Sequence, residues 1–455
     1  MARTLSTWTP RILLLLMPCA VASAAVAAVT PVTGASSLLA ANHAAVGDDG
    51  KPGTIDARFD CSGQGLTGMV RNVSDRATGA YVDSYDLGPM RGASGYDGRI
   101  PWMQDLSGAY TAQEGGDRPA VAANEAYRNA NLWWRGDRGG AVVEWKGREP
   151  IDDVPAYHLV VTPRGGKRFD AWFDATTHLL LRVDEAQQFL TISTRYADFA
   201  RRRGMMVAHT VTVDSGSGPA GLQTLKLTRF DVGAARPLSA YSRPSEAPAG
   251  AVIAGGAAGT TVPIRLANNH VYVDAKVNGK GPFRFIVDTG GHTILTPATV
   301  AALGLASQGE APSAGAGEKI ETTGFAKVGE IAVGDMRMRD QTAFTLDFAS
   351  RETEGFEVDG MIGFEFFRRF AVRIDYGNGT MTIIDPKRFN PKDAGTPIRF
   401  RFYDHVPQVD GRFNDLPDRF DIDTSSHSEI DLTTPFVEHA QLHSAYPNAV
   451  LAVDG

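Results

Sequence analysis

Hydrophobic residues between positions 157 and 230 fall in short runs that polar turns separate. Six runs rich in β-branched and aromatic residues span residues 157–162, 168–173, 177–183, 190–196, 205–213 and 222–230. The intervening segments are short and polar or contain glycine, a pattern typical of an antiparallel meander rather than of strands joined by crossover helices. One helix is expected upstream, over residues 120–134. Residues 48–232 are therefore predicted to form one β-rich domain.

Large aromatic side chains are concentrated in the first part of this domain. They lie at Tyr96, Trp102, Tyr127, Trp133 and Trp134. Such residues either line a cleft for an apolar ligand or fill a hydrophobic core. Core filling is the favoured interpretation, because large apolar side chains are usually buried in the interior of a domain.

Two segments are expected to contribute no core of their own. Residues 25–47 are rich in alanine and glycine and are predicted to be a disordered lead. Residues 233–262 are dominated by proline, alanine, glycine and serine and have few large aliphatic side chains. This composition is typical of a linker between domains.

An internal repeat follows the linker. The stretch PIRLANNHVYVDAKVNGKGPFRFIVDTGGHTI begins at Pro263, and PIRFRFYDHVPQVDGRFNDLPDRFDIDTSSHSEI begins at Pro397. Pro-Ile-Arg, His-Val, Arg-Phe, Asp-Thr and a following histidine recur in the same order, and the gaps needed to align the copies fall in turns. We therefore expect a first lobe over residues 263–390 and the start of a second lobe over residues 396–455.

Each copy places an aspartate between a buried strand and a short helix. The two triplets are Asp288-Thr289-Gly290 and Asp423-Thr424-Ser425. After the first triplet, Thr296 can cap a helix that Pro297 opens and Gly304 ends. After the second, Thr434 and Pro435 repeat that start before residues 436–442. Both triplets are thus predicted to lie in loops.

The N-terminus has the layout of a secretory signal peptide over residues 1–24. Arg3 and Arg11 precede an apolar stretch, which runs into the Ala22-Ser23-Ala24 cleavage pattern. A membrane anchor is the alternative, but Pro18 and the small residues around it weaken a spanning helix. The sequence therefore predicts export to the periplasm or envelope of a bacterium, or secretion.

Composition narrows the classes of function further. The chain has 455 residues, a formal net charge of −7 and 2 cysteines. That length suggests two or three domains, and the absence of a long basic run makes nucleic-acid binding a poor hypothesis. Cleavage after Ala24 would leave Cys61 alone, so neither an intramolecular disulfide nor a cysteine-based metal site is expected.

Two motifs in the first lobe carry a resemblance to a known family. They are Phe285-Ile286-Val287-Asp288-Thr289-Gly290 and Met361-Ile362-Gly363. Through them the chain resembles the retropepsin-like aspartic proteases, and specifically bacterial envelope proteins of that type. The resemblance covers the first lobe well and the second copy in its first part. It implies an all-β lobe in which the Asp-Thr-Gly loop lies beside a strand with two hydrophobic residues and a glycine, with a closing hairpin over residues 370–384.

The resemblance also implies an activity, that of an aspartic endopeptidase with a polypeptide substrate and no cofactor or metal. Asp288 and Asp423 would be the catalytic pair. Two carboxylates about 3 Å apart share one proton, so the ionised member can activate a water while the protonated member donates to the peptide carbonyl. Thr289 and Thr424 would hold the two loops together. The other implied residues support the loops (Gly290, Ser425, Met361, Ile362 and Gly363) or form a flap over the substrate (Ala314, Gly315, Ala316 and Gly317).

The second copy departs from the family pattern in two ways. Ser425 stands where glycine is usual, and about thirty residues follow Asp423, so the second flap and the second hydrophobic-hydrophobic-glycine strand are not present. Three interpretations remain: a fragment of a longer protein, a degenerate second lobe, or a homodimer in which Asp288 pairs with its symmetry mate. We favour a fragment of a longer protein. A second Asp-Thr within the chain makes an internal pair a simpler arrangement than a homodimer.

Other motifs have simpler interpretations. A turn aspartate is the structural alternative for Asp288 and, more strongly, for Asp423. The stretch that begins at Asp421 imitates a phosphatase signature, but too few residues follow it for that fold. His292 and His427 are expected to be loop residues rather than catalytic ones. The pair His439 and His443 has helical spacing for a metal, yet no third ligand is evident, so a solvated helix face is favoured and no metal is expected. Neither H-E-x-x-H nor G-x-S-x-G occurs.

The N-terminal domain carries a second resemblance. The order Tyr96-Asp97-Gly98, Trp102, Trp133-Trp134 and then residues 171–176 is similar to the domain that accompanies bacterial aspartyl-protease lobes. It also resembles, more distantly, the half-barrel of lipoprotein-carrier proteins. This implies a curved antiparallel sheet whose concave face binds an apolar ligand. The rival to the protease hypothesis is therefore an envelope binding protein without enzymatic activity, in which the sheet holds an apolar ligand or polypeptide.

Overall fold

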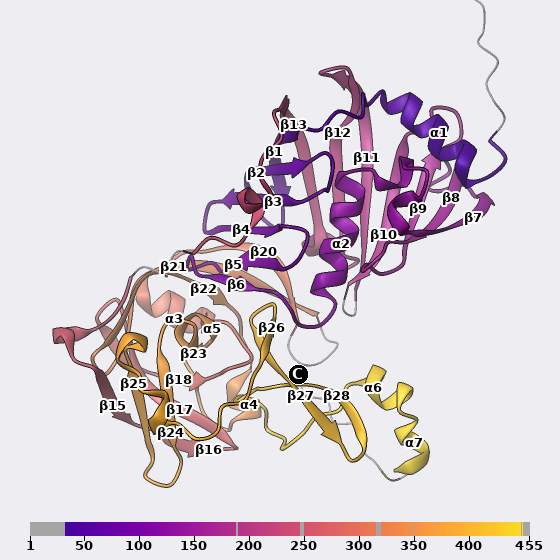
Figure 1. The fold of residues 1–455 in the computed structure, drawn as a ribbon. Coiled ribbons are helices and arrows are strands. Elements are labelled where there is room, and N and C mark those ends of the chain that lie inside the picture. Colours follow the sequence, from indigo (N-terminus) through magenta and orange to yellow (C-terminus); the bar gives the residue numbers. More distant parts are fainter. Residues whose placement is uncertain are drawn as a thin grey trace, which may run out of the picture.

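An antiparallel sheet of 13 strands forms the N-terminal half of the computed structural model (Figure 1). The structure describes residues 32–187, 190–245, 250–314, 320–347, 349–446 and 448, so the predicted signal peptide lies outside the described residues. Among the described residues, no helix is both long enough and apolar enough to span a bilayer. The predicted class, mainly β with a curved N-terminal antiparallel sheet followed by a second β unit, is confirmed.

The strands of the N-terminal sheet follow one another in the order of a meander. Beginning at one edge they run β6, β5, β4, β3, β2, β1, β13 and then down to β7. Their bounds are β1 Thr54–Gly63, β2 Leu66–Asp75, β3 Tyr81–Leu87, β4 Met90–Tyr96, β5 Pro101–Gln104, β6 Tyr110–Ala112, β7 Val142–Arg148, β8 Ala156–Thr162, β9 Phe169–Asp174, β10 Leu180–Gln187, β11 Leu190–Arg202, β12 Met205–Asp214 and β13 Leu222–Gly233. Each of the six predicted runs overlaps a strand, although the run at 177–183 becomes β10 only from Leu180. The pairing of β1 with β13 joins the two halves of the sheet.

Two helices pack on this sheet and supply much of its core (Figure 1). Helix α1 spans Ala35–Val46, so the prediction of a disordered lead over residues 25–47 is wrong for this part. Leu38 and Leu39 are fully buried there, and this burial against the sheet stabilises a helix that alanine content alone did not indicate. Helix α2 spans Arg118–Asn129, and the short 3₁₀ helix η1 spans Leu132–Trp134. The predicted continuous helix over 120–134 is interrupted because Asn131 adopts a left-handed conformation.

Most of the aromatic side chains noted in the sequence fill the interior. Trp102, Tyr127 and Trp133 are at most 3 % exposed. Tyr127 and Trp133 meet edge to face with their ring centroids 5.9 Å apart, and both belong to the core between the helices and the sheet. The helices and these aromatic residues thus fill a hydrophobic core against the sheet.

The segment predicted to be a linker contains secondary structure that joins the two halves. The 3₁₀ helix η4, Leu238–Tyr241, buries Tyr241, whose carbonyl accepts a hydrogen bond from the Trp102 indole at 2.8 Å. Strand β14, Ala251–Ile253, pairs with β22, Met336–Thr345. Strand β15, Gly259–Pro263, pairs with β25, Thr380–Ile384. The small side chains in this segment therefore do not prevent backbone pairing at sheet edges.

The first lobe is built on a nine-stranded sheet, with a three-stranded sheet beside it. The nine-stranded sheet contains β14, β16 Arg265–Ala267, β17 His270–Val277, β18 Lys280–Val287, β19 Ile294–Leu295, β20 Ser307–Ala314, β21 Ile320–Val333, β22 Met336–Thr345 and β23 Gly360–Ile362. The smaller sheet is β15, β24 Ala371–Asp375 and β25 Thr380–Ile384, the last two forming the expected hairpin. Helices α3 Pro297–Leu303, α4 Ser350–Thr353 and α5 Phe364–Phe367 complete the lobe. As predicted, the Thr296 hydroxyl caps α3, and Gly304 ends it with a left-handed conformation.

The second copy of the repeat folds like the start of the first. Strands β26 Arg401–Tyr403, β27 Val406–Phe413 and β28 Leu416–Asp421 pair in the same antiparallel order as β16, β17 and β18. Helix α6 spans Thr434–His439 and is followed by α7, Leu442–Ala445. The two helices are separate because Gln441 is left-handed, so the single helix predicted to Leu442 is wrong.

The N-terminal unit contacts both lobes through the stretch around β6. The Arg369 guanidinium of the first lobe donates to the Ser107 carbonyl at 2.8 Å, and Arg368 donates to the Tyr110 carbonyl at 2.9 Å. On the other side, Gln113 exchanges two hydrogen bonds with the backbone of Asp404 in the second copy. One edge of the large sheet therefore connects both lobes.

We expect the Leu39→Ala substitution to destabilise the N-terminal unit by about 2 to 5 kcal/mol, because it removes a fully buried side chain and leaves a cavity. Every tryptophan after Trp8 lies in this unit, so denaturant unfolding followed by tryptophan fluorescence reports on it. The matched control is Ala40→Ser at an exposed position of the same helix, which should change the stability by less than about 0.5 kcal/mol. Equal stability of the two variants would contradict the role of α1 in the core.

Candidate active site

Asp288 is positioned by two neighbouring strands of the first lobe. It follows β18, whose last three residues are buried, and β18 runs parallel to β23 with Val287 opposite Ile362. The Asp288 amide continues this pairing with a hydrogen bond to the Ile362 carbonyl at 3.1 Å. The expected neighbour strand, Met361-Ile362-Gly363, thus lies beside the Asp-Thr-Gly loop and fixes where the aspartate emerges.

The two Asp-Thr loops meet and exchange hydrogen bonds through their threonines. The Thr289 hydroxyl donates to the Ile422 carbonyl, and the Thr424 hydroxyl donates to the Val287 carbonyl, both at 2.8 Å. Each hydroxyl also accepts from the amide of the other threonine, at 3.1 and 3.0 Å. The four bonds are related by a local two-fold symmetry, so they match the repeat in the sequence. All of them lie within a single chain.

Each aspartate carboxylate accepts a hydrogen bond from the backbone amide two residues later in the chain. The Gly290 amide donates to Asp288 Oδ1 at 2.7 Å, and the Ser425 amide donates to Asp423 Oδ1 at 2.8 Å. Gly290 also lies against the opposite carboxylate, since a Cβ at this position would stand 2.6 Å from Asp423 Oδ2. A side chain here would displace Asp423, which explains the glycine. Ser425 adds a hydroxyl that donates to Asp423 Oδ1 at 2.8 Å.

The environment of Asp288 favours its protonated form. The residue is 3 % exposed, and burial together with the charge of the adjacent Asp423 raises the pKa of its carboxyl to about 7. Amide hydrogen bonding by Gly290 and the Ser425 hydroxyl oppose this shift. Asp423 is partly exposed. One buried and one more open carboxyl group, in contact, can share a proton between them at neutral and mildly acidic pH.

A buried glutamate that was not predicted from the sequence supports the first Asp-Thr loop. Glu365 in α5 is 1 % exposed, accepts a hydrogen bond from the Thr293 amide at 2.8 Å, and lies 2.7 Å from His292 Nδ1. Burial alone would raise its pKa, but the charged His292 lowers the pKa of Glu365 to about 2. His292 is therefore a positioning residue in an ion pair behind the loop, as the loop-residue interpretation suggested. No local spacing links positions 292 and 365.

Other predicted site residues are placed as follows. Ala314 ends β20 in a hairpin with β21, while Gly315, Ala316 and Gly317 lie outside the described residues. The base of that hairpin contacts the N-terminal sheet, where the Glu310 amide donates to the Gln64 carbonyl at 2.7 Å. His439 and His443 belong to different helices, α6 and α7, so they do not share the helix face that was considered.

Comparisons with known proteins agree with this geometry in the first lobe. A family model described as aspartyl protease matches residues 273–366, a span that includes Asp288 and the Met361-Ile362-Gly363 strand. The match supports an aspartyl protease domain there. Asp423 lies beyond the matched span. None of the curated proteins matches the chain.

Solved structures with a distant likeness are found as well. A LolA superfamily protein from Nitrosomonas europaea is 14 % identical, with 46 % of this chain and 97 % of that chain covered and a TM-score of 0.33. A DUF1329 family protein from Desulfovibrio piger is 14 % identical, with 46 % and 95 % covered and a TM-score of 0.34. The MucA/MucB complex structure from Pseudomonas aeruginosa is 14 % identical over 72 % of this chain and 98 % of that chain, with a TM-score of 0.16. All three TM-scores are low.

The raised pKa of Asp288 predicts how stability depends on pH. The native state holds the Asp288 proton more tightly than the unfolded chain does. This proton therefore contributes its full stabilisation below the ordinary pKa of 3.8, and the stabilisation is lost as the pH rises towards about 7. Asp288→Asn removes the titration. We expect the variant to gain stability over the wild type across this window, by on the order of 1.4 kcal/mol per pH unit at most. Thermal unfolding of both proteins between about pH 4 and 8 measures the difference; parallel curves would contradict the assignment.

Proposed function

We propose that this protein is an aspartic endopeptidase in which Asp288 and Asp423 form the catalytic pair. The observation that carries the proposal is the reciprocal hydrogen bonding of Thr289 and Thr424, which brings the two aspartate loops together within one chain. A turn aspartate needs no such partner. The family match to residues 273–366 supports the same class of activity.

The different burial of the two carboxyl groups would decide which one acts as the acid and which one acts as the base. Asp288 is the more buried member and the one whose pKa is raised, so it retains the shared proton and donates it to the peptide carbonyl oxygen. Asp423 is more open and takes a proton from the attacking water. The water adds to the carbonyl carbon. Asp423 then passes the proton that it took to the amide nitrogen, the C–N bond breaks, and a hydroxyl proton of the intermediate returns to Asp288. Each step moves protons among the water, the pair and the substrate.

The substrate is proposed to be an extended polypeptide. In the family that the first lobe resembles, a flap covers an extended chain, and we propose that the β20–β21 hairpin takes this role here. We also propose that the protein acts after export, in the periplasm or envelope, because the first 24 residues have the layout of a secretory signal. The envelope binding protein remains the second candidate, but aromatic residues that could line its cleft, Tyr127 and Trp133, instead fill a core against the sheet.

Loss of one carboxylate should abolish cleavage. We expect Asp288→Asn and Asp423→Asn each to lower the rate of cleavage of an unfolded protein substrate by about 100-fold or more, since each removes an acid–base group. The rate is measured by product analysis between about pH 3 and pH 8. Asp274→Asn, which removes an exposed carboxylate from the same repeat, is the matched control and should cleave like the wild type. Cleavage retained in Asp288→Asn would refute the pair, and no cleavage by the wild type would favour the binding protein.

Ser425 should tune the pH range of the activity. Burial and Asp423 raise the pKa of Asp288, and the Ser425 hydroxyl lowers it. Ser425→Ala removes the lowering contribution, so the pair keeps its proton to higher pH and the alkaline limb of the activity profile should move upwards. Ser444→Ala, at an exposed position of α7, is the control. A limb that stays in place or moves to lower pH would show that the hydroxyl does not act on the pair.

A further inference from the structure

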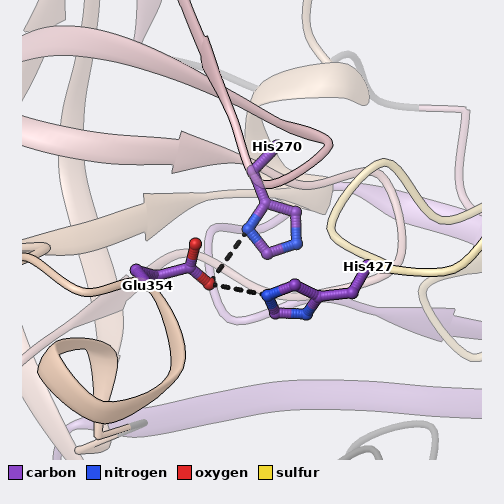
Figure 2. Close-up of side chains that lie close together, drawn as sticks. All are labelled: His270, Glu354 and His427. Atoms are coloured by element: carbon purple, nitrogen blue, oxygen red, sulfur yellow. Dashed lines mark ion pairs between the residues drawn. The ribbon is translucent and has the colours of Figure 1, made fainter.

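Three side chains from distant parts of the chain converge in the C-terminal half of the structure (Figure 2). His270 is the first residue of β17, and Glu354 ends α4 in the same lobe. His427 follows the second Asp-Thr pair by a few residues and belongs to the second copy of the repeat. One nitrogen or oxygen atom from each residue lies within 4.8 Å of the others.

The distances are those of ligands around one small cation. Glu354 Oε1 lies 3.1 Å from His270 Nδ1 and 3.2 Å from His427 Nε2. A tetrahedral zinc ion about 2.0 to 2.2 Å from each donor holds neighbouring ligand atoms about 3.4 Å apart. Both distances to Glu354 Oε1 are slightly shorter than that spacing, and all three donor atoms lie within 4.8 Å of one another. Figure 2 shows both imidazoles directed at the same carboxylate oxygen.

The surrounding hydrogen bonds orient the carboxylate for this role. Glu354 Oε2 accepts from the Tyr272 hydroxyl at 2.7 Å and from the Asn268 amide at 3.1 Å, so Oε1 is the atom that faces the histidines. The Asn269 side chain donates to the His427 carbonyl at 2.7 Å and holds the backbone of that loop. Partners of this kind fix ligand geometry in metal sites.

Burial distinguishes the cluster from a surface ion pair. The side chains of His270 and Glu354 are each 3 % exposed, whereas that of His427 is 41 % exposed. His270 Nε2 has no hydrogen-bond partner among the described residues, so the polar contacts of this buried ring are directed into the cluster. Two buried donors and a third at the surface leave one side of a bound ion open to water.

We propose that His270, Glu354 and His427 form a binding site for a divalent transition-metal ion of the zinc type. Two imidazoles and one carboxylate suit zinc, whereas magnesium and calcium prefer oxygen donors throughout. No metal was expected from the sequence, where His427 was predicted to be a loop residue, and the three positions have no characteristic spacing. The ion would join the loop that follows Asp423 to the first lobe. This connection would supplement the hydrogen bonds between Thr289 and Thr424. The site does not depend on the proposed protease activity.

Metal binding by untagged full-length protein tests the proposal. After dialysis against a chelator, we expect calorimetric titration with zinc chloride to show one ion per chain, and cobalt chloride to give the visible absorption of a tetrahedral site. His427→Ala should weaken zinc binding by more than about 100-fold, because even outer partners of a metal change its affinity by 10- to 100-fold. Zinc should also raise the Tm of the wild type but not that of His427→Ala.

Two control variants show whether zinc binds at these three residues or elsewhere on the chain. His439→Ala removes an exposed histidine of α6 and should bind zinc like the wild type. Asp288→Asn should do so as well, whether or not the protein is a protease. His427 is half exposed, so its loss should leave the fold intact, as circular dichroism can verify. Absence of zinc binding to the wild type, or equal loss of binding in His427→Ala and His439→Ala, would refute the site.

Discussion

The exchange of hydrogen bonds between Thr289 and Thr424 is the constraint on which the candidate site depends. Two carboxyl groups in contact repel when both are ionised, so nothing in their own chemistry keeps Asp288 beside Asp423. The threonine hydroxyls are neutral, and each satisfies a carbonyl of the opposite loop while accepting from the opposite amide. Because these bonds do not change with pH, the pair can gain or lose a proton while its separation is preserved.

The N-terminal unit packs against both the first lobe and the second copy of the repeat. Arg368 and Arg369 bind it to the first lobe, and the Arg118 guanidinium lies 2.9 Å from the Asp404 carboxylate of the second copy. Hydrophobic contact between Leu66 in the sheet and Phe325 in β21 adds to this. The second copy has few buried residues of its own, so these contacts help to hold the loop that carries Asp423 in register with its partner.

Local patterns in the sequence predicted much of the fold and the two Asp-Thr loops of the candidate site. The strand runs, the Thr296 cap and the repeat were all readable, because each depends on neighbours along the chain. The repeat also pointed to Asp423 as the counterpart of Asp288. What could not be read depends on packing between distant segments. The contact of Glu365 with His292 and the burial of Leu38 produce no periodic pattern in the sequence. The small side chains of the presumed linker gave no indication of the strands within it.

The pairing of β1 with β13 has a consequence for how the chain is made. These strands are neighbours in the middle of the large sheet, yet they stand at opposite ends of the N-terminal unit in the order of synthesis. Residues 54–63 therefore emerge from the ribosome well before residues 222–233, and one edge of β1 stays unpaired until β13 has been synthesised. Such long-range closure is slow and leaves hydrophobic edges exposed in the interval. The large sheet therefore closes only after the whole N-terminal unit has been synthesised.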